Sequence, residues 1–330
     1  MERNSKINGL RNNVPFFVQL YFLFLYIKFD RGESMKNVIN YYYNLLPEEI
    51  HQNGSITKFE YQNEQYTLLP YSLNTDIKSL YEMSVRLLQR GIYTHQIIPN
   101  KDGQLLTMVN NTPYLVLKHM DDLEKEITLE DLIAFQEATK YITYDSELVS
   151  WQTLWSNKID YFEYQVSQFG RRNPNIRKSF SFYVGLAENG IILAKTIEKQ
   201  SKKIVHRRIY KKSTFFDLYN PLNFVQDISI RDIAEYFKDA FLYDENVFEE
   251  ITKYFQTHYL TAKDYQTFFV RMFYPSFYFD RFEKVMDGEL EDDELAEINK
   301  KSDDYIALLK KLYLLLSGYV ILPEIEWLRR

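Results

Sequence analysis

The spacing of apolar residues changes near residue 120. Before that point, short runs rich in aromatic and β-branched residues are separated by turn-forming residues, which predicts β-hairpins. The predicted strand pairs are residues 55–61 with 65–71, around Gln62-Asn63-Glu64, and residues 104–109 with 114–119. Helical spacing runs from Met35 to Pro47 and again over residues 76–90, which end at Gly91. Residues 35–120 therefore predict a small helix-plus-sheet lobe with one long helix between two hairpins.

After an acidic stretch at residues 120–126, which we interpret as a hinge, apolar residues recur at the period of amphipathic helices. A capping-box-like Thr128-Leu129-Glu130-Asp131 opens the first helix, and Asn189-Gly190 predicts a helix break. The predicted helices cover residues 129–141, 151–170, 173–188, 191–201, 231–243, 245–258, 261–273, 275–287 and 291–317. The pattern therefore predicts an α+β fold, with a small α/β lobe at 35–120 and a large helical lobe at 121–330.

Residues 14–27 are the most apolar run in the chain. A helix of about 14 residues is short for a bilayer, which takes roughly 20. Basic residues precede the run, as in a signal peptide, but no small-residue cleavage site follows it. A third interpretation is that translation starts at Met35, because residues 31–33 can be encoded by a purine-rich, ribosome-binding-like stretch. Residues 1–34 would then be a non-native extension, and a signal or anchor and a genuine packed extension stay as alternatives.

The composition excludes several classes of partner and site. The formal net charge is −6, so no basic field predicts a nucleic-acid partner. The absence of cysteine excludes disulfides, a thiolate nucleophile and a sulfur-ligated metal. The five histidines lack metal-ligand spacing, so zinc chemistry is not expected. The 28 tyrosines and 24 phenylalanines suit packing or cross-linking in an assembly, but A/T-rich codons would produce the same bias.

Two short apolar runs each lead into polar residues, and an amphipathic helix follows. The runs are Ile204-Val205 before His206-Arg207-Arg208, and Phe224-Val225 before Gln226-Asp227, while Asp232 lies in the first turn of the helix. Further motifs accompany them in order: Asn100-Lys101-Asp102-Gly103, Tyr114-Leu115-Val116-Leu117, Trp151 with Trp155, and Glu326-Trp327-Leu328. From Met35 onward, this order resembles the bilobal protein-kinase-like fold of the aminoglycoside phosphotransferase/choline kinase clan. Within that clan it is similar to the spore-coat-associated kinase-like family of the CotS/YutH type.

The resemblance implies positions for the parts that hold nucleotide phosphates. A glycine-rich turn belongs in the first hairpin, but Gln62-Asn63-Glu64 contains no glycine. The phosphate-binding lysine belongs near Leu69, and Glu82 is the helix glutamate that would pair with it. Since leucine carries no charge, Glu82 has no such partner at Leu69, and the alternative is that Glu82 is an ordinary solvated helix residue.

The resemblance places the catalytic aspartate at Arg208 and the metal-binding asparagine at Ser213. A guanidinium cannot accept a proton at neutral pH, and a serine offers one weak oxygen ligand. Asp227 aligns with the metal-loop aspartate and is the one acid that survives among several cations, a poor site for Mg²⁺. We therefore expect no catalytic residue, no metal and no cofactor, and we predict that Arg208 lies within ion-pair reach of Asp227.

Asp232 has an expected structural role. The resemblance implies that it accepts hydrogen bonds from the catalytic-loop backbone, and the alternative is an acid that stabilises the helix dipole. His206 is expected to pack or hydrogen-bond within the loop and not to act as an acid or base.

The function implied by the resemblance is that of a pseudokinase, a structural or interaction component of the bacterial endospore coat. Such a protein would be made in the cytoplasm of the sporulating cell and deposited in the coat among other coat proteins, with a membrane role not expected. The first alternative is a small-molecule phosphotransferase, acting on a hydroxyl or amine with ATP and Mg²⁺ held by displaced residues such as Asp217, Asn220 or Asp227. Two further alternatives remain. One is a nucleotide-independent binder of small molecules between the lobes, and the other is membrane association through residues 14–27.

Overall fold

The computed structural model describes residues 35–72, 75–120, 123–142, 150–170, 173–197, 200–243 and 246–329. These residues divide into two compact units. The first takes residues 35–72 and 97–119, and the second takes residues 75–96 and 120–329. The helix that the sequence placed in a lobe of residues 35–120 is thus grouped with the second unit. The alternatives for residues 1–34 lie outside the described residues.

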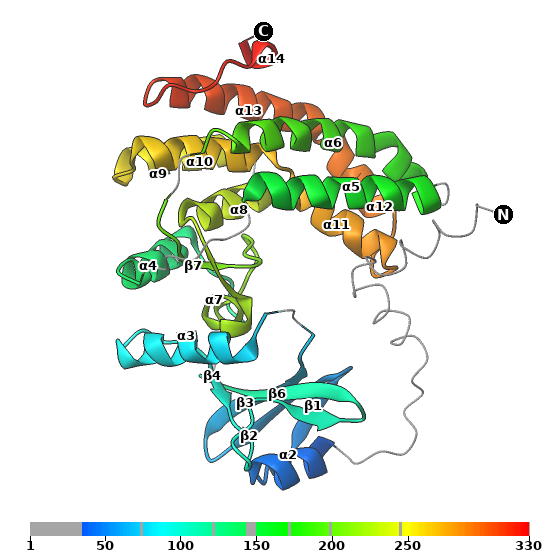
Figure 1. Cartoon of the computed structure of the whole chain (residues 1–330), viewed down its shortest axis with the longest axis vertical. Coiled ribbons are helices and arrows are strands. Elements are labelled where there is room, and N and C mark those ends of the chain that lie inside the picture. Colours follow the sequence, from blue (N-terminus) through cyan, green and yellow to red (C-terminus); the bar gives the residue numbers. More distant parts are fainter. Residues whose placement is uncertain are drawn as a thin grey trace, which may run out of the picture. The chain divides into compact units, whose positions relative to one another are not determined.

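The first unit is built on an antiparallel meander with one helix, α2 (Met35–Tyr43) (Figure 1). The described strands are β1 (Ile50–Asn53), β2 (Ile56–Tyr61), β3 (Glu64–Pro70), β4 (Gln96–Ile98), β5 (Thr107–Val109) and β6 (Thr112–His119). They follow the order β1-β2-β3-β6-β4, and β5 pairs with β6. Both predicted hairpins are confirmed, whereas β1 and β4 were not predicted. Apolar residues of α2 share a core with Phe59, Leu68 and Val116.

Both hairpins turn without glycine. Gln62 and Asn63 have φ values of 54° and 60°, and Asn110 and Asn111 have φ values of 48° and 63°. Two consecutive left-handed residues are what a type I′ turn requires, and asparagine tolerates that conformation better than most residues. The first turn is one residue shorter than the predicted Gln62-Asn63-Glu64, because Glu64 already pairs with Tyr61.

The second unit consists of helices and one short strand pair, β7 (Lys203–His206) with β8 (Phe224–Asp227). Its described helices are α3 (Ile77–Gln89), α4 (Leu129–Thr139), α5 (Trp151–Phe169), α6 (Pro174–Ala194), α7 (Phe215–Tyr219), the 3₁₀ helix η2 (Pro221–Asn223), α8 (Ile230–Ala240), α9 (Val247–Thr257), α10 (Ala262–Phe273), α11 (Ser276–Met286), α12 (Asp293–Lys300), α13 (Ser302–Ser317) and α14 (Glu326–Arg329). The predicted capping box at α4 is present between Thr128 and Asp131.

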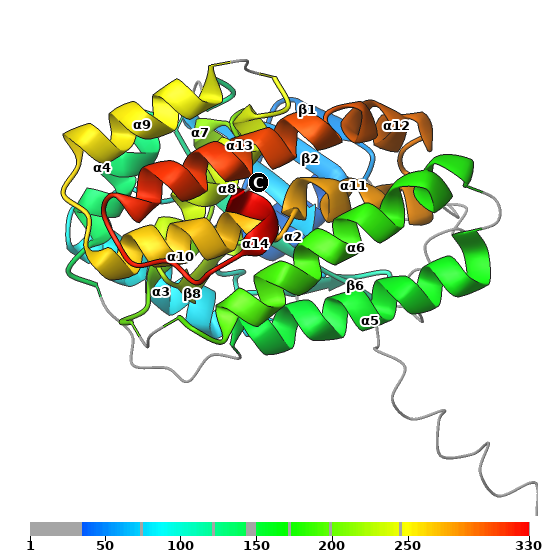
Figure 2. The same cartoon turned by 90° about the horizontal axis from the view of Figure 1, so that it is seen from above.

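Helix α8 lies at the centre of this unit. Every residue of α8 except Arg231 is buried. Helix α10 contacts α8, α6 and α13, which lie around it in Figure 2. A helix that is buried on all sides has no solvent-facing stripe, so its polar residues need partners inside the protein.

Two predicted helix boundaries are wrong. Asn189-Gly190 does not break α6, which continues to Ala194. A Cβ atom on Gly190 would lie 3.3 Å from the Phe273 Cβ and from the Tyr274 nitrogen, so glycine serves the close approach of α6 to the end of α10.

The predicted helix at 291–317 is two helices, α12 and α13. Lys301 separates them with φ −93° and ψ 7°, and its N–H donates to the Ile298 carbonyl, three residues back, at 3.0 Å. Its ammonium donates to the Leu242 carbonyl at 2.7 Å, which fixes the break from outside the helix.

The C-terminal residues dock onto the second unit. Leu328 is 2% exposed, and the Trp327 ring meets the Phe273 ring at 5.9 Å. The apolar residues of the tail therefore pack against the second unit. In the described ranges, no helix combines the length and the hydropathy that a membrane span needs.

Candidate functional site

The loop between β7 and β8 begins at a buried histidine. The register of the pair sets His206 opposite Phe224, and Lys203 opposite Asp227. The backbone N–H of His206 donates to both oxygens of Asp232 at 3.1 Å. This is the backbone hydrogen bond expected from the sequence. Since His206 is 1% exposed and Asp232 is 0% exposed, water cannot replace either partner.

The His206 ring is held at both nitrogens. Its Nδ1 lies 2.7 Å from an Asp232 oxygen, and its Nε2 lies 2.9 Å from the Leu218 carbonyl oxygen. A neutral imidazole has one N–H, so both contacts are hydrogen bonds only if the ring is cationic or the carboxyl of Asp232 carries the proton. In either state both nitrogens are occupied, and the ring has no free nitrogen for acid–base chemistry.

Asn223 holds the backbone of the next two loop residues. Arg207 donates its N–H to the Asn223 carbonyl at 2.6 Å, and Arg208 donates its N–H to the Asn223 Oδ1 at 3.0 Å. The Asn223 amide donates back to the Arg208 carbonyl at 2.7 Å. The sequence analysis did not single out Asn223. In the sequence, Asn223 is marked only as a polar residue directly before the apolar run Phe224-Val225.

The Arg208 side chain points away from Asp227 and pairs with acids on α11. Its Nη2 lies 3.0 Å from Asp280 and 3.8 Å from Glu283. Burial alone would lower the pKa of Arg208, but the carboxylate of Asp280, with Tyr210 and Glu283, outweighs it and raises that pKa. The predicted ion pair between Arg208 and Asp227 is wrong.

Arg231 takes the place that was predicted for Arg208. Its Nη1 lies 3.1 Å from Oδ2 of Asp227, because the first turn of α8 brings residue 231 back over residue 227. The Trp151 indole N–H donates to the same carboxylate at 2.9 and 3.1 Å, and the Ile228 N–H donates to Oδ1 at 2.8 Å. Lys202 approaches to 3.8 Å. Both oxygens of Asp227 therefore accept from donors of the chain itself.

The other proposed metal-binding oxygens cap the local backbone. Ser213 is 5% exposed and its Oγ accepts from the Tyr210 N–H at 3.0 Å. Asp217 accepts from the Thr214 N–H at 2.8 Å. Asn220 accepts from the Leu222 N–H at 3.0 Å. Across the described part of the chain, no three acidic or histidine side chains form a group suited to a metal ion.

Leu69 and Glu82 belong to different units. Leu69 lies in β3 opposite Leu115, and Glu82 lies in α3. The Glu82 side chain is 61% exposed and its carboxylate is 3.9 Å from the Lys78 ammonium on the same helix. That geometry fits the alternative of a solvated helix residue.

A buried ionic cluster surrounds Glu235 and was not predicted from the sequence. Glu235 of α8 accepts from Lys238 at 2.8 Å, from Arg271 at 2.5 Å, and from the Ser276 hydroxyl. The Arg271 guanidinium also lies 4.7 Å from the centre of the Trp151 ring. Trp151 therefore links Asp227 to this cluster.

The charges of the cluster shift each other's protonation. Burial would raise the pKa of Glu235, but Arg271 and Lys238 outweigh it and hold that pKa well below its ordinary value. Burial lowers the pKa of Lys238 to about 8, against the opposing effect of Glu235.

The chain has the kinase-like fold of aminoglycoside phosphotransferases. An aminoglycoside phosphotransferase from Alicyclobacillus acidocaldarius superposes with a TM-score of 0.62 at 11% identity, over 88% of this chain and 98% of that one. The aminoglycoside phosphotransferase APH(4)-Ia, solved with ADP and hygromycin B, superposes with a TM-score of 0.55 at 9% identity, over 84% of this chain and 99% of that one. At such identities the likeness concerns the fold.

A family model assigns the chain more narrowly. The model described as "Spore coat putative kinase YutH" matches residues 36–312, so this chain belongs to that family. The endospore coat-associated protein YutH of Bacillus subtilis is 24% identical over 255 residues, which are 67% of this chain and 74% of that protein.

Proposed function

We propose that this protein is a catalytically inactive member of its kinase-like family, which acts as a structural or interaction component of the bacterial endospore coat. The observation that carries the proposal is the state of Asp227. Phosphoryl transfer needs a carboxylate that binds Mg²⁺, and Mg²⁺ prefers oxygen ligands that are free of bound cations. Both oxygens of Asp227 instead accept from Arg231, Trp151 and the Ile228 N–H. Mg²⁺ would have to displace a guanidinium that is 12% exposed.

The catalytic-base position supports the same proposal. Arg208 occupies it, and its guanidinium pairs with Asp280 and Glu283. A permanently charged guanidinium cannot take the proton of an attacking hydroxyl. Ser213 stands at the metal-binding amide position and accepts from the backbone. The base and one metal ligand are therefore replaced, and the remaining metal ligand, Asp227, is occupied by Arg231 and Trp151.

The Bacillus subtilis relative is described as endospore coat-associated. From that description we infer deposition in the coat and contact with other coat proteins. We extend that location to this chain, with synthesis in the cytoplasm of the sporulating cell. A fluorescent fusion should collect in the coat layers around the forespore and stay with the coat fraction of purified spores. A fusion that stays diffuse through sporulation would contradict the coat assignment.

Isothermal titration of the full chain with ATP and Mg²⁺ tests the loss of catalysis. We expect no saturable heat up to millimolar nucleotide, under conditions in which an active aminoglycoside phosphotransferase binds. Micromolar binding that requires Mg²⁺ and disappears in Asp227→Asn would overturn the proposal and favour a phosphotransferase with a non-standard metal site.

A further inference from the structure

The chain crosses between its two units three times: before Thr75, after Gln96 and before Met120. Motion of one compact unit relative to another is absorbed by a few residues at such crossings, which change their backbone angles. The groups that hold the residues beside each crossing therefore decide how freely the chain can bend there.

The first crossing is tied to the loop after β7. The Thr75 hydroxyl accepts from Nη2 of Arg207 at 2.7 Å. Arg207 is itself fixed at its backbone, since its N–H donates to the Asn223 carbonyl at 2.6 Å and its carbonyl accepts from Nη2 of Arg231 at 3.1 Å. The side chain that reaches the crossing thus starts from a backbone that is held on both sides.

The second crossing is tied to α7. The backbone N–H of His95 donates to the Tyr219 carbonyl at 2.9 Å, and the Thr94 hydroxyl donates to the same carbonyl at 2.9 Å. The Nε2 of His95 lies 3.0 Å from the Phe216 carbonyl oxygen. Thr94 and His95 are both 0% exposed, so a bend that moved them would leave buried polar groups without their partners.

The third crossing is tied to the second. The backbone N–H of Met120 donates to the Tyr93 hydroxyl at 2.9 Å, and that hydroxyl lies 3.2 Å from Nδ1 of His95. One neutral form of His95 satisfies these contacts, with the proton on Nε2 and Nδ1 accepting from Tyr93. The Tyr93 ring also packs edge-on against the Tyr219 ring of α7, with their centres 4.9 Å apart.

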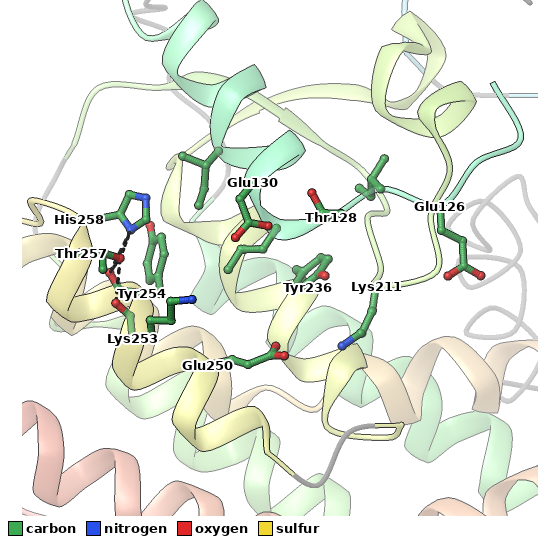
Figure 3. Close-up of a pocket in the computed structure, with 13 residues that line it drawn as sticks. Glu126, Thr128, Glu130, Lys211, Tyr236, Glu250, Lys253, Tyr254, Thr257 and His258 are labelled. Carbon is green, nitrogen blue, oxygen red and sulfur yellow. Dashed lines mark hydrogen bonds between the residues drawn. The ribbon is translucent and has the colours of Figure 1, made fainter. Parts of the chain in front are cut away.

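Beyond Met120, residues 123–127 run antiparallel to residues 213–216. The N–H groups of Phe216, Phe215 and Ile127 donate to the carbonyls of Leu123, Lys125 and Ser213, at 2.9, 3.1 and 2.9 Å respectively. Glu126 forms a β-bridge with Thr214 between them. Figure 3 shows Glu126 and, from the loop after β7, Lys211 at the same end of the pocket that lies beside these segments.

The partners of the three crossings all fall within residues 207–219, which we call the anchor segment. This segment is joined to the buried centre of the second unit, because Nε2 of His206 lies 2.9 Å from the Leu218 carbonyl oxygen and the His206 ring also contacts Asp232 of α8. The loop that resembles a catalytic loop is thus also the place where every crossing is held.

We propose that the anchor segment restricts bending at the three crossings and so limits the motion of one unit relative to the other. Compact units that are joined by linkers move relative to one another by default, so a restricted motion is a distinct property of this chain. The inference does not depend on the loss of phosphoryl transfer, because the side chains that hold the crossings are those of Thr75, Tyr93, His95 and Arg207.

Distances between spin labels on the two units test the proposal. The chain contains no cysteine, so two introduced cysteines accept labels at defined sites. Met108→Cys in the first unit and Ile192→Cys in the second use side chains that are 58% and 61% exposed. Pulsed electron paramagnetic resonance then gives the distribution of label distances, and we expect one narrow population while the anchor residues are intact.

Removal of two hydroxyls should release the first and third crossings. Tyr93→Phe and Thr75→Val together take away the groups that accept from Met120 and Arg207, at nearly constant side-chain size. The width of the distance distribution should at least double. Exchange of the Met120 amide hydrogen should also become at least tenfold faster in Tyr93→Phe.

Tyr161→Phe with Thr252→Val is the matched control. Both hydroxyls lie in helices of the second unit, where Tyr161 accepts from Gln165 at 3.0 Å and Thr252 donates to the Phe248 carbonyl at 2.8 Å. This pair should leave the distance distribution unchanged.

Two outcomes overturn the proposal: a distribution that is already broad with the anchor residues intact, or one that stays as narrow in Y93F with T75V as in the control pair. Far-UV circular dichroism shows whether each variant is folded. If Y93F with T75V does not fold, Tyr93→Phe with Arg207→Met releases the same two crossings and is held to the same criterion.

Discussion

Two residues of one loop, His206 and Arg208, are held in opposite ways. His206 is 1% exposed, and its backbone and ring both bind Asp232. The Arg208 side chain is 44% exposed, and its partners on α11, Asp280 and Glu283, are 12% and 33% exposed. The shape of the loop therefore depends on buried groups that take no part in phosphoryl transfer. Arg208 stands at the position that resembles a catalytic base, and the backbone bonds that shape the loop run through His206, Asp232 and Asn223 instead of its guanidinium.

The largest effect is expected from Asp232→Asn. Asparagine keeps one acceptor oxygen but puts an amide group in place of the second carboxylate oxygen that binds His206, and both residues are buried. Breaking a buried charged contact of this kind costs about 3–5 kcal/mol of the free energy of unfolding. Urea unfolding measures it.

Asp76→Asn is the matched control for that change. Asp76 caps α3 from an exposed position, and asparagine caps a helix about as well as aspartate, so a change below about 0.5 kcal/mol is expected. Equal losses in the two variants would mean that the buried contact to His206 does not hold the loop.

The pH should change the free energy of unfolding by a smaller amount, through Glu235, which lies one turn further along α8. Because its folded pKa is depressed, the unfolded chain binds this proton first as the pH falls below the ordinary value of 4.5. The stabilisation is therefore complete above that value and is lost towards acid, at about 1.4 kcal/mol for each pH unit.

Urea unfolding between pH 6 and pH 3 checks this. The free energy of unfolding should fall more steeply in the natural sequence than in Glu235→Gln, by about 2 kcal/mol at pH 3. Parallel profiles would show that Glu235 does not carry a depressed pKa.

The local parts of this structure could be predicted from the sequence. The hairpins, the capping box at Thr128 and the contact of Asp232 with the loop follow from residues near one another or from the order of motifs. The partner of Asp227 could not, because Arg208 in the loop after β7 and Arg231 in the first turn of α8 were both candidates, and only the direction of that turn selects Arg231.

Contacts between distant segments were missed for a related reason. Gly190 has the local signature of a helix break, yet its role is set by Phe273, which lies far along the chain. The cluster of Glu235 and Arg271 likewise joins two helices whose sequences each suit a simple amphipathic pattern. No local preference records such a pairing, because tertiary packing decides it.

The smallest change in the free energy of unfolding is expected from Arg208→Gln, which tests the half-exposed residue of the pair His206 and Arg208. A half-exposed ion pair is worth about 0–1 kcal/mol, and the change leaves the backbone bonds between residue 208 and Asn223 in place. Asn223→Ala removes those bonds and should cost about 1–3 kcal/mol, measured by urea unfolding in both variants. If Arg208→Gln costs as much as Asn223→Ala, the guanidinium itself holds the loop. Arg208 would then be a structural replacement for the catalytic residue, and the separation of loop shape from loop chemistry would fail at this position.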